Sequence, residues 1–168
     1  MIKSESKLFR VLQLFSSGFL FLVLTGSGAE AVGRMPDFSL TSAIDGKQVT
    51  SDEYQGQALL ITFFATWCPP CRQEIPSLIK LQEKYVAEGF SVIGISMDEK
   101  GPKVVAKLIE KENINYPILM SDRKTERDFG GIIGIPTSFL FDRQGNMVKR
   151  YPGYAPYSML EKDIKSIL

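Results

Sequence analysis

The sequence predicts an α/β domain, in which a central mixed β-sheet is flanked by helices and extended by an N-terminal β-hairpin. Residues 58–64 and 90–97 are continuous apolar runs, which is typical of strands buried on both faces of a sheet. Apolar residues at helical spacing lie between them, at 75–86, and strand–helix alternation of this kind indicates parallel pairing. Turn residues at Asp45-Gly46 and at 142–145 add hairpins near both ends, so the sheet is expected to be mixed.

Turn and helix-breaking residues divide the rest of the chain into elements. Extended segments at 35–40 and 47–50 flank the first turn. Gly89 ends the long helix that starts within the cysteine motif, and Gly101-Pro102 opens the next helix. The remaining expected elements are the first turn of a short helix at 51–54, helix 102–112, strand 116–120, short helix 125–129, strands 137–141 and 146–150, and an amphipathic helix at 158–168.

The N-terminus has the pattern of a targeting segment. Three cations precede a largely apolar run of 14 residues, Val11 to Leu24, and Ala29-Glu30-Ala31 follows as a small-residue cleavage site. We expect residues 1–31 to be a signal peptide cleaved after Ala31, with an uncleaved inner-membrane anchor at residues 11–24 as the alternative. Residues 32–168 then form the domain, in the periplasm or another extracytoplasmic space.

Charge and composition exclude several functional classes. Removal of residues 1–31 leaves 17 basic and 17 acidic residues with no basic run, so nucleic acid is not an expected partner. The chain contains no histidine, which excludes Ser-His and Cys-His nucleophile pairs and blue-copper sites.

Cys68 and Cys71 are the only cysteines in the chain. As a disulfide, a pair this close would add little to folding stability. A metal site needs about four ligands, and no third cysteine or histidine exists to complete one. What remains for the pair is thiol–disulfide exchange, with the dithiol as the redox group and no cofactor or metal.

The spacing also predicts how the local fold activates one thiol. If Cys68 takes the N-cap position, Pro69 and Pro70 are the first two helical residues, and neither has an N–H to donate. The Cys71 N–H is then the main donor to a Cys68 thiolate, and the helix dipole adds to its stabilisation. With a single such donor we expect a moderately lowered thiol pKa, nearer ~7 than ~3.5.

The cysteine motif and its surroundings resemble a known family. Residues 63–72 (FFATWCPPCR) are similar to the thioredoxin active-site signature, Pro76 matches its helix-bending proline, and residues 134–137 (GIPT) match its cis-proline loop. The signal segment, the opening hairpin and the extra strand–helix unit after Phe90 resemble the TlpA/ResA-like branch of extracytoplasmic thiol–disulfide oxidoreductases in the redoxin superfamily. The resemblance covers about residues 35–168 and implies a thioredoxin-like fold.

The resemblance also implies a role for each matching residue. Cys68 corresponds to the exposed nucleophile, and Cys71 to the more buried resolving cysteine. Pro136 is expected to follow a cis peptide bond and to pack against the disulfide, while the Ile135 backbone pairs with a bound substrate strand. The residues expected at the substrate surface are Trp67, Ile135, Pro136 and Thr137, with simple packing as the alternative for Trp67.

A proton-transfer group is also implied by the resemblance. Glu74 lies one helical turn after Cys71 and resembles a glutamate that assists the resolving thiol in ResA-like proteins; the alternative is a solvated helix carboxylate. Cytoplasmic thioredoxins place a buried aspartate where this chain has Thr62, so Glu74 is the candidate substitute.

The leading function is disulfide exchange with protein substrates, as a reductant that keeps apocytochrome c thiols reduced or that reduces misoxidised proteins. Electrons are then expected from a membrane thiol donor. One alternative is a redox-silent module that binds extended peptides. A peroxiredoxin-type peroxidase is another, although Ala65 and Ile61 stand where that class has a threonine and a proline.

Overall fold

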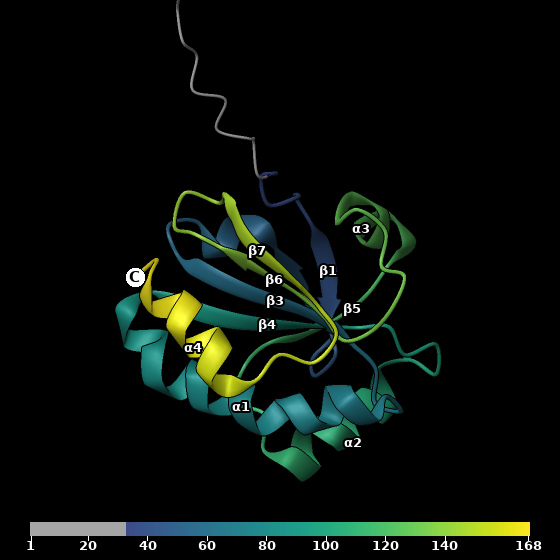
Figure 1. Ribbon diagram of the computed structural model, residues 1–168. Coiled ribbons are helices and arrows are strands. Elements are labelled where there is room, and N and C mark those ends of the chain that lie inside the picture. Colours follow the sequence, from purple (N-terminus) through teal and green to yellow (C-terminus); the bar gives the residue numbers. More distant parts are fainter. Residues whose placement is uncertain (1–32) are drawn as a thin grey trace, which may run out of the picture. The chain divides into compact units, whose positions relative to one another are not determined.

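The computed structural model describes residues 33–168 (Figure 1). The signal or anchor segment predicted at residues 1–31 therefore lies outside the described residues. Within 33–168, no helix has both the length and the apolar character that a membrane span requires.

One seven-stranded mixed sheet forms the centre of the domain, in the order β2-β1-β5-β4-β3-β6-β7. The three central strands are parallel, and all other neighbours are antiparallel. The β1–β2 hairpin adds to the β5 edge, as expected of an N-terminal extension. The strands are β1 (Ser39–Ser42), β2 (Gln48–Thr50), β3 (Ala58–Phe64), β4 (Phe90–Ser96), β5 (Ile118–Met120), β6 (Thr137–Phe141) and β7 (Met147–Pro152).

The predicted extended segment at 35–40 differs from the observed strand, which starts at Ser39. Arg34 instead forms an isolated bridge with Asn146, and the Met35 N–H donates to the carbonyl of Gly145 at 2.8 Å. Pro36 follows and has no N–H to donate to a ladder. The first described residues are therefore tied to the β6–β7 turn, and pairing with β2 begins later.

Helices cover both faces of the sheet, in agreement with the sequence-based prediction. Buried side chains of α1, α2 and α4 share one apolar cluster, and Figure 1 shows these helices gathered on one side of the sheet. The other face carries α3, the short helix η1 and a second apolar cluster. The helices are η1 (Ser51–Tyr54), α1 (Pro69–Tyr85), η2 (Val86–Glu88), α2 (Pro102–Glu112), α3 (Arg123–Asp128) and α4 (Tyr157–Lys165).

Register between the two longest strands determines where the loops meet. β3 and β4 are buried along their whole length and pair in parallel, with Phe64 opposite Ser96. Parallel neighbours end at the same edge of a sheet, so the β3–α1 and β4–α2 loops lie side by side there. The cysteine motif follows β3 directly and occupies this edge.

Candidate active site

The two cysteines form a disulfide at the start of α1. Cys68 is the N-cap residue, with φ −87° and ψ 111°, and its Cα lies 5.3 Å from that of Cys71. The Cys71 N–H donates to the Sγ of Cys68 at 3.3 Å. The predicted N-cap geometry is confirmed, including the prolines at the first two helical positions.

The loop before β6 lies against this disulfide. The Ile135–Pro136 peptide bond is cis, as expected, and Pro136 is buried. The carbonyl oxygen of Ile135 lies 3.7 Å from the Sγ of Cys68. A backbone hydrogen bond also connects the loop to the residue after β7, since the Gly153 N–H donates to the Pro136 carbonyl at 2.8 Å.

The expected difference in exposure between the two cysteines is not observed. Cys68 is 3% exposed and Cys71 is 2% exposed. The disulfide holds the two sulfur atoms together, and the Ile135 carbonyl oxygen contacts the Sγ of Cys68. The prediction of an exposed Cys68 is therefore wrong for the oxidised protein.

Two large apolar side chains near the cysteines and the cis-proline loop are nevertheless exposed. Trp67 is 68% exposed directly before Cys68, and Ile133 is 98% exposed two residues before Ile135. Thr137 behaves differently, because it is buried and its hydroxyl donates to the Gly134 carbonyl at 2.7 Å. Thr137 thus holds the shape of the loop, while Trp67 and Ile133 form the accessible apolar surface.

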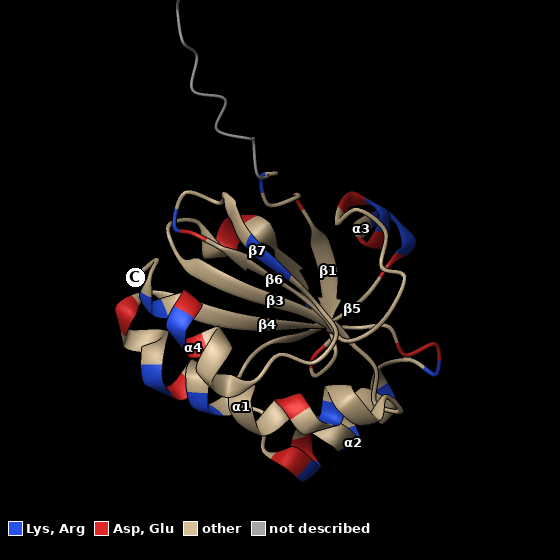
Figure 2. Ribbon diagram, viewed as in Figure 1, with Lys and Arg blue, Asp and Glu red and all other residues tan. Residues whose placement is uncertain are grey.

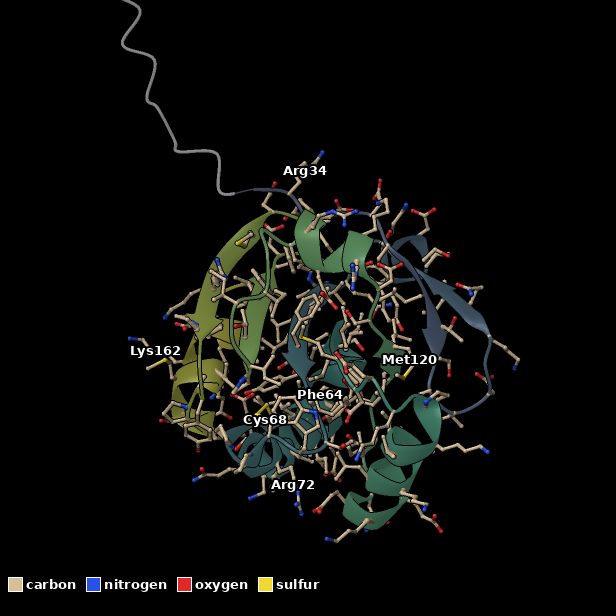
Figure 3. The ribbon with its side chains drawn as sticks, turned by 90° about the vertical axis from the view of Figure 1, so that its right-hand side faces the viewer. Arg34, Phe64, Cys68, Arg72, Met120 and Lys162 are labelled. Carbon is tan, nitrogen blue, oxygen red and sulfur yellow. A yellow bond between two sulfur atoms is a disulfide. The ribbon has the colours of Figure 1, made fainter. Side chains whose placement is uncertain are left out.

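Shallow hollows flank this surface. One of about 460 Å³ lies between residues 133–137 and the end of β7, and another of about 290 Å³ lies between Trp67 and residues 97–100. A larger hollow of about 610 Å³ includes Arg34 and lies at the opposite end of the strands. Figure 3 shows Cys68 and Arg34 at opposite ends of the domain, so the larger hollow is remote from the disulfide.

Glu74 is buried beneath the site, which rules out the alternative of a solvated helix carboxylate. It is 1% exposed, and its Oε1 accepts the N–H of Ala155 at 2.9 Å. Burial raises the pKa of Glu74 to about 7, although the hydrogen bond from Ala155 opposes this change. Burial also raises the pKa of Tyr116, and the charge of the neighbouring Glu74 adds to that effect.

A second buried carboxylate, Asp98, lies at the same edge of the sheet and is 6% exposed. It accepts hydrogen bonds from Thr66, two residues before Cys68, and from Ser96. Sequence reasoning missed Asp98, although an acidic residue directly behind a buried strand that neighbours the cysteine strand was a usable signal. Ile133 was also missed, and its position in a glycine-rich loop beside Pro136 was the available signal.

Charge around the site is mixed. Acidic and basic residues alternate over α2, α3 and α4 in Figure 2, and no face in that view carries a single sign. Within residues 33–168, no three side chains of the metal-binding types come together as a candidate metal site. The redox and acidic groups described at the site are the two sulfur atoms and the two buried carboxylates.

Known proteins share both the sequence pattern and the fold. A family model described as Redoxin matches residues 31–168. The chain is 32% identical over 146 residues to the thiol-disulfide oxidoreductase ResA of Geobacillus thermodenitrificans, covering 86% of this chain and 80% of that protein. It is 32% identical over 120 residues to the thioredoxin-like protein YneN of Bacillus subtilis, and the match covers 70% of this chain and 69% of that protein.

A comparison with solved structures also identifies a thioredoxin-family protein. The chain is 35% identical to a thiol:disulfide interchange protein of the thioredoxin family from Chlorobium tepidum TLS, with a TM-score of 0.74. The match covers 80% of this chain and 94% of that one. The expected thioredoxin-like fold and the expected resemblance are thereby confirmed.

Proposed function

The chain belongs to the Redoxin family and is a thiol–disulfide oxidoreductase, and from that premise we propose that it reduces disulfides of extracytoplasmic proteins through Cys68 and Cys71. The observation that carries the proposal is the oxidised pair at the N-cap of α1, with the cis-proline loop against it. This arrangement supplies a reactive sulfur and a backbone edge for an extended substrate.

Cys68 is the nucleophile in this proposal. In the reduced protein its thiolate accepts the Cys71 N–H and lies at the positive end of the α1 dipole. It attacks one sulfur of a substrate disulfide, so that a Cys68–substrate bond forms while the substrate disulfide breaks. The other substrate sulfur leaves as a thiolate.

Cys71 then resolves the mixed disulfide. Its thiol loses a proton, its sulfur attacks Cys68, and the second substrate sulfur leaves as a thiolate. The Cys68–Cys71 disulfide of the structure is the product of this step. The protein has then given two electrons to its substrate, and an external dithiol donor restores the reduced state.

Glu74 is the proposed acceptor of the Cys71 proton. It lies one turn further along α1 and is buried, so it faces the interior from which Cys71 must deprotonate. A pKa near 7 lets the carboxyl group exchange a proton at neutral pH. Its positioning by the Ala155 N–H keeps it at one place beneath the site.

Substrate contact is proposed at the exposed apolar surface beside the disulfide. Trp67 contributes a large accessible ring, and the Ile135 backbone offers a pairing edge next to Cys68. Pro136 and Thr137 hold that edge in position. An extended, partly unfolded segment around a substrate disulfide fits such a surface.

The reducing direction is supported by the number of thiolate donors. Pro69 and Pro70 remove two N–H groups from the first turn of α1, which leaves the Cys71 N–H as the observed donor to Cys68. A less stabilised thiolate makes the dithiol a weaker oxidant. Oxidised apocytochrome c, whose thiols must be returned to the reduced state, and misoxidised proteins are the proposed substrates, with a membrane thiol donor as the electron source. An extracytoplasmic location is supported by the N-terminal sequence pattern.

Trapping tests the nucleophile directly. In Cys71→Ser the mixed disulfide cannot resolve, so expression in an oxidising compartment should yield proteins linked to Cys68 that dithiothreitol releases. Cys68→Ser, which keeps Cys71, is the matched control and should trap far less. Equal trapping by both variants would contradict the assigned roles.

The role of Glu74 needs a pH-resolved measurement. Glu74→Gln keeps an oxygen for the Ala155 N–H but removes the proton acceptor, so release of the second substrate thiol should slow and lose its pH dependence near 7. Glu83→Gln removes an exposed carboxylate from the same helix and serves as control. An unchanged profile in Glu74→Gln would remove Glu74 from the mechanism.

The two alternative functions have weaker support. A redox-silent peptide-binding module has no use for a disulfide, and this protein carries one at the site. Insulin reduction by dithiothreitol distinguishes the candidate functions. An oxidoreductase should accelerate this reaction, whereas a binding module or a peroxidase should not. Consumption of hydrogen peroxide identifies the peroxidase.

A further inference from the structure

Asp98 connects the two loops that meet at the carboxyl edge of the sheet. Its Oδ2 accepts the Thr66 N–H at 2.8 Å, and its Oδ1 accepts the Thr66 hydroxyl at 2.6 Å. The Ser96 hydroxyl donates to Oδ2 at 2.8 Å and in turn accepts the N–H of Asp98 at 3.2 Å. A carboxylate on the β4–α2 loop thus holds one residue of the β3–α1 loop by both its backbone and its side chain.

Both oxygens of this carboxyl group are engaged in hydrogen bonds. The Thr66 N–H, the Thr66 hydroxyl and the Ser96 hydroxyl all donate to them. A buried polar network that is satisfied in this way holds its members in one arrangement. Glu74, by contrast, accepts one N–H on one oxygen. The two buried carboxylates therefore have different tasks.

The residue that Asp98 holds lies just ahead of the nucleophile. Thr66 precedes Cys68 by two positions, and the Cys68 N–H donates to the carbonyl of Ala65 at 3.1 Å. The neighbouring contact between the Met97 N–H and the Phe64 carbonyl, at 2.8 Å, ends the strand pairing. After this last backbone contact, the hydrogen bonds between Asp98 and Thr66 connect the β3–α1 loop, which contains Cys68, to the β4–α2 loop.

We propose that Asp98 is a positioning residue of the exchange reaction, which sets the orientation of Cys68 by clamping Thr66. The loop that contains Asp98 also forms, through residues 97–100, the wall of the hollow beside Trp67. The clamp therefore fixes the nucleophile relative to a surface that the substrate contacts. This inference rests on the proposed role of Cys68 as nucleophile.

A kinetic comparison of Thr66 variants tests the clamp. Thr66→Val keeps the shape of the side chain but replaces the hydroxyl that donates to Asp98 with a methyl group, whereas Thr66→Ser keeps the hydroxyl. The pre-reduced full-length protein is mixed with a disulfide-containing peptide, and the second-order rate constant is followed by fluorescence of Trp67, the only tryptophan in the chain. We expect Thr66→Val to react about tenfold more slowly, the factor that one lost hydrogen bond to a charged group gives, and Thr66→Ser to react within about twofold of wild type.

Asp98→Asn extends the test into a double-mutant cycle. Asp98→Asn should slow the reaction at least as much as Thr66→Val, and the double variant should be no slower than Asp98→Asn alone, because both changes remove the hydrogen bond from the Thr66 hydroxyl to the carboxylate. Asp142→Asn is the matched control, since Asp142 also accepts loop N–H groups, from Gln144 and Asn146, at the remote β6–β7 turn. It should react within about twofold of wild type.

The outcomes separate this inference from the proposed function. If wild type does not react with the peptide, the role of Cys68 fails. If wild type reacts and Thr66→Val reacts equally fast while unfolding at lower urea, the clamp is structural only and the inference is overturned. Additive effects in the double variant would also overturn it.

Discussion

Replacing Glu74 by glutamine should stabilise the protein, and the gain should depend on pH in a defined way. The carboxyl group has an ordinary pKa of 4.5, and burial raises it to about 7 in the folded state. Between those pH values the folded protein binds more protons at this position than the unfolded chain does. The free energy of unfolding contributed by Glu74 is therefore intact below pH 4.5 and is lost as pH rises through 7.

The size of the effect follows from the same two values. A difference of about 2.5 pKa units corresponds to about 3 kcal/mol of unfolding free energy above pH 7. Glutamine has a similar shape, keeps an oxygen for the Ala155 N–H, and carries no charge to bury. The free energy of unfolding of Glu74→Gln should therefore exceed that of wild type by about 3 kcal/mol at about pH 9. Near pH 4.5 the two free energies should become similar.

Urea unfolding of the oxidised proteins between about pH 4 and 9 measures this difference, and oxidation prevents titration of the thiols from contributing. Glu83→Gln, an exposed change on the same helix, should give a difference that stays near zero across the range. The reasoning is refuted if Glu74→Gln gains nothing at high pH, or if its gain is constant from pH 4.5 to 7.

Three further predictions concern the core and the substrate surface. Gly94→Ala should cost about 1–3 kcal/mol in urea unfolding, because the added Cβ meets Ile118 and comes within 3.2 Å of the Phe64 ring; wild-type stability would show that these side chains move aside freely. Phe139→Ala should cost about 3–5 kcal/mol, since the ring is 1% exposed and packs edge-on against Phe63 and Phe129; a loss below 1 kcal/mol would contradict that packing. Ile133→Ser should leave the unfolding midpoint unchanged, because the side chain is 98% exposed, yet raise the KM for a disulfide peptide about tenfold; an unchanged KM would place substrate contact elsewhere.

Local patterns were sufficient to predict most of the fold. The two continuous apolar runs became the paired central strands β3 and β4, and the Asp45-Gly46 turn became the β1–β2 hairpin. These features depend on burial and turn geometry within a few residues, which a single sequence displays. The residue at which β1 begins was not predicted from the extended segment at 35–40, because Met35 pairs with the distant Gly145, a contact that no local pattern reveals.

The features of the candidate site also differ in whether local sequence or tertiary packing determines them. The sequence alone determined the redox pair, because two cysteines, two prolines and a preceding strand specify an N-cap geometry within four residues. Only the tertiary structure decided the environment of that pair. It buried Cys68 beneath the Ile135 carbonyl, buried Glu74 against Ala155, and brought Asp98 to Thr66 across 32 positions of sequence. Desolvation and hydrogen bonding depend on which distant segments come together, and that depends on how the whole chain packs.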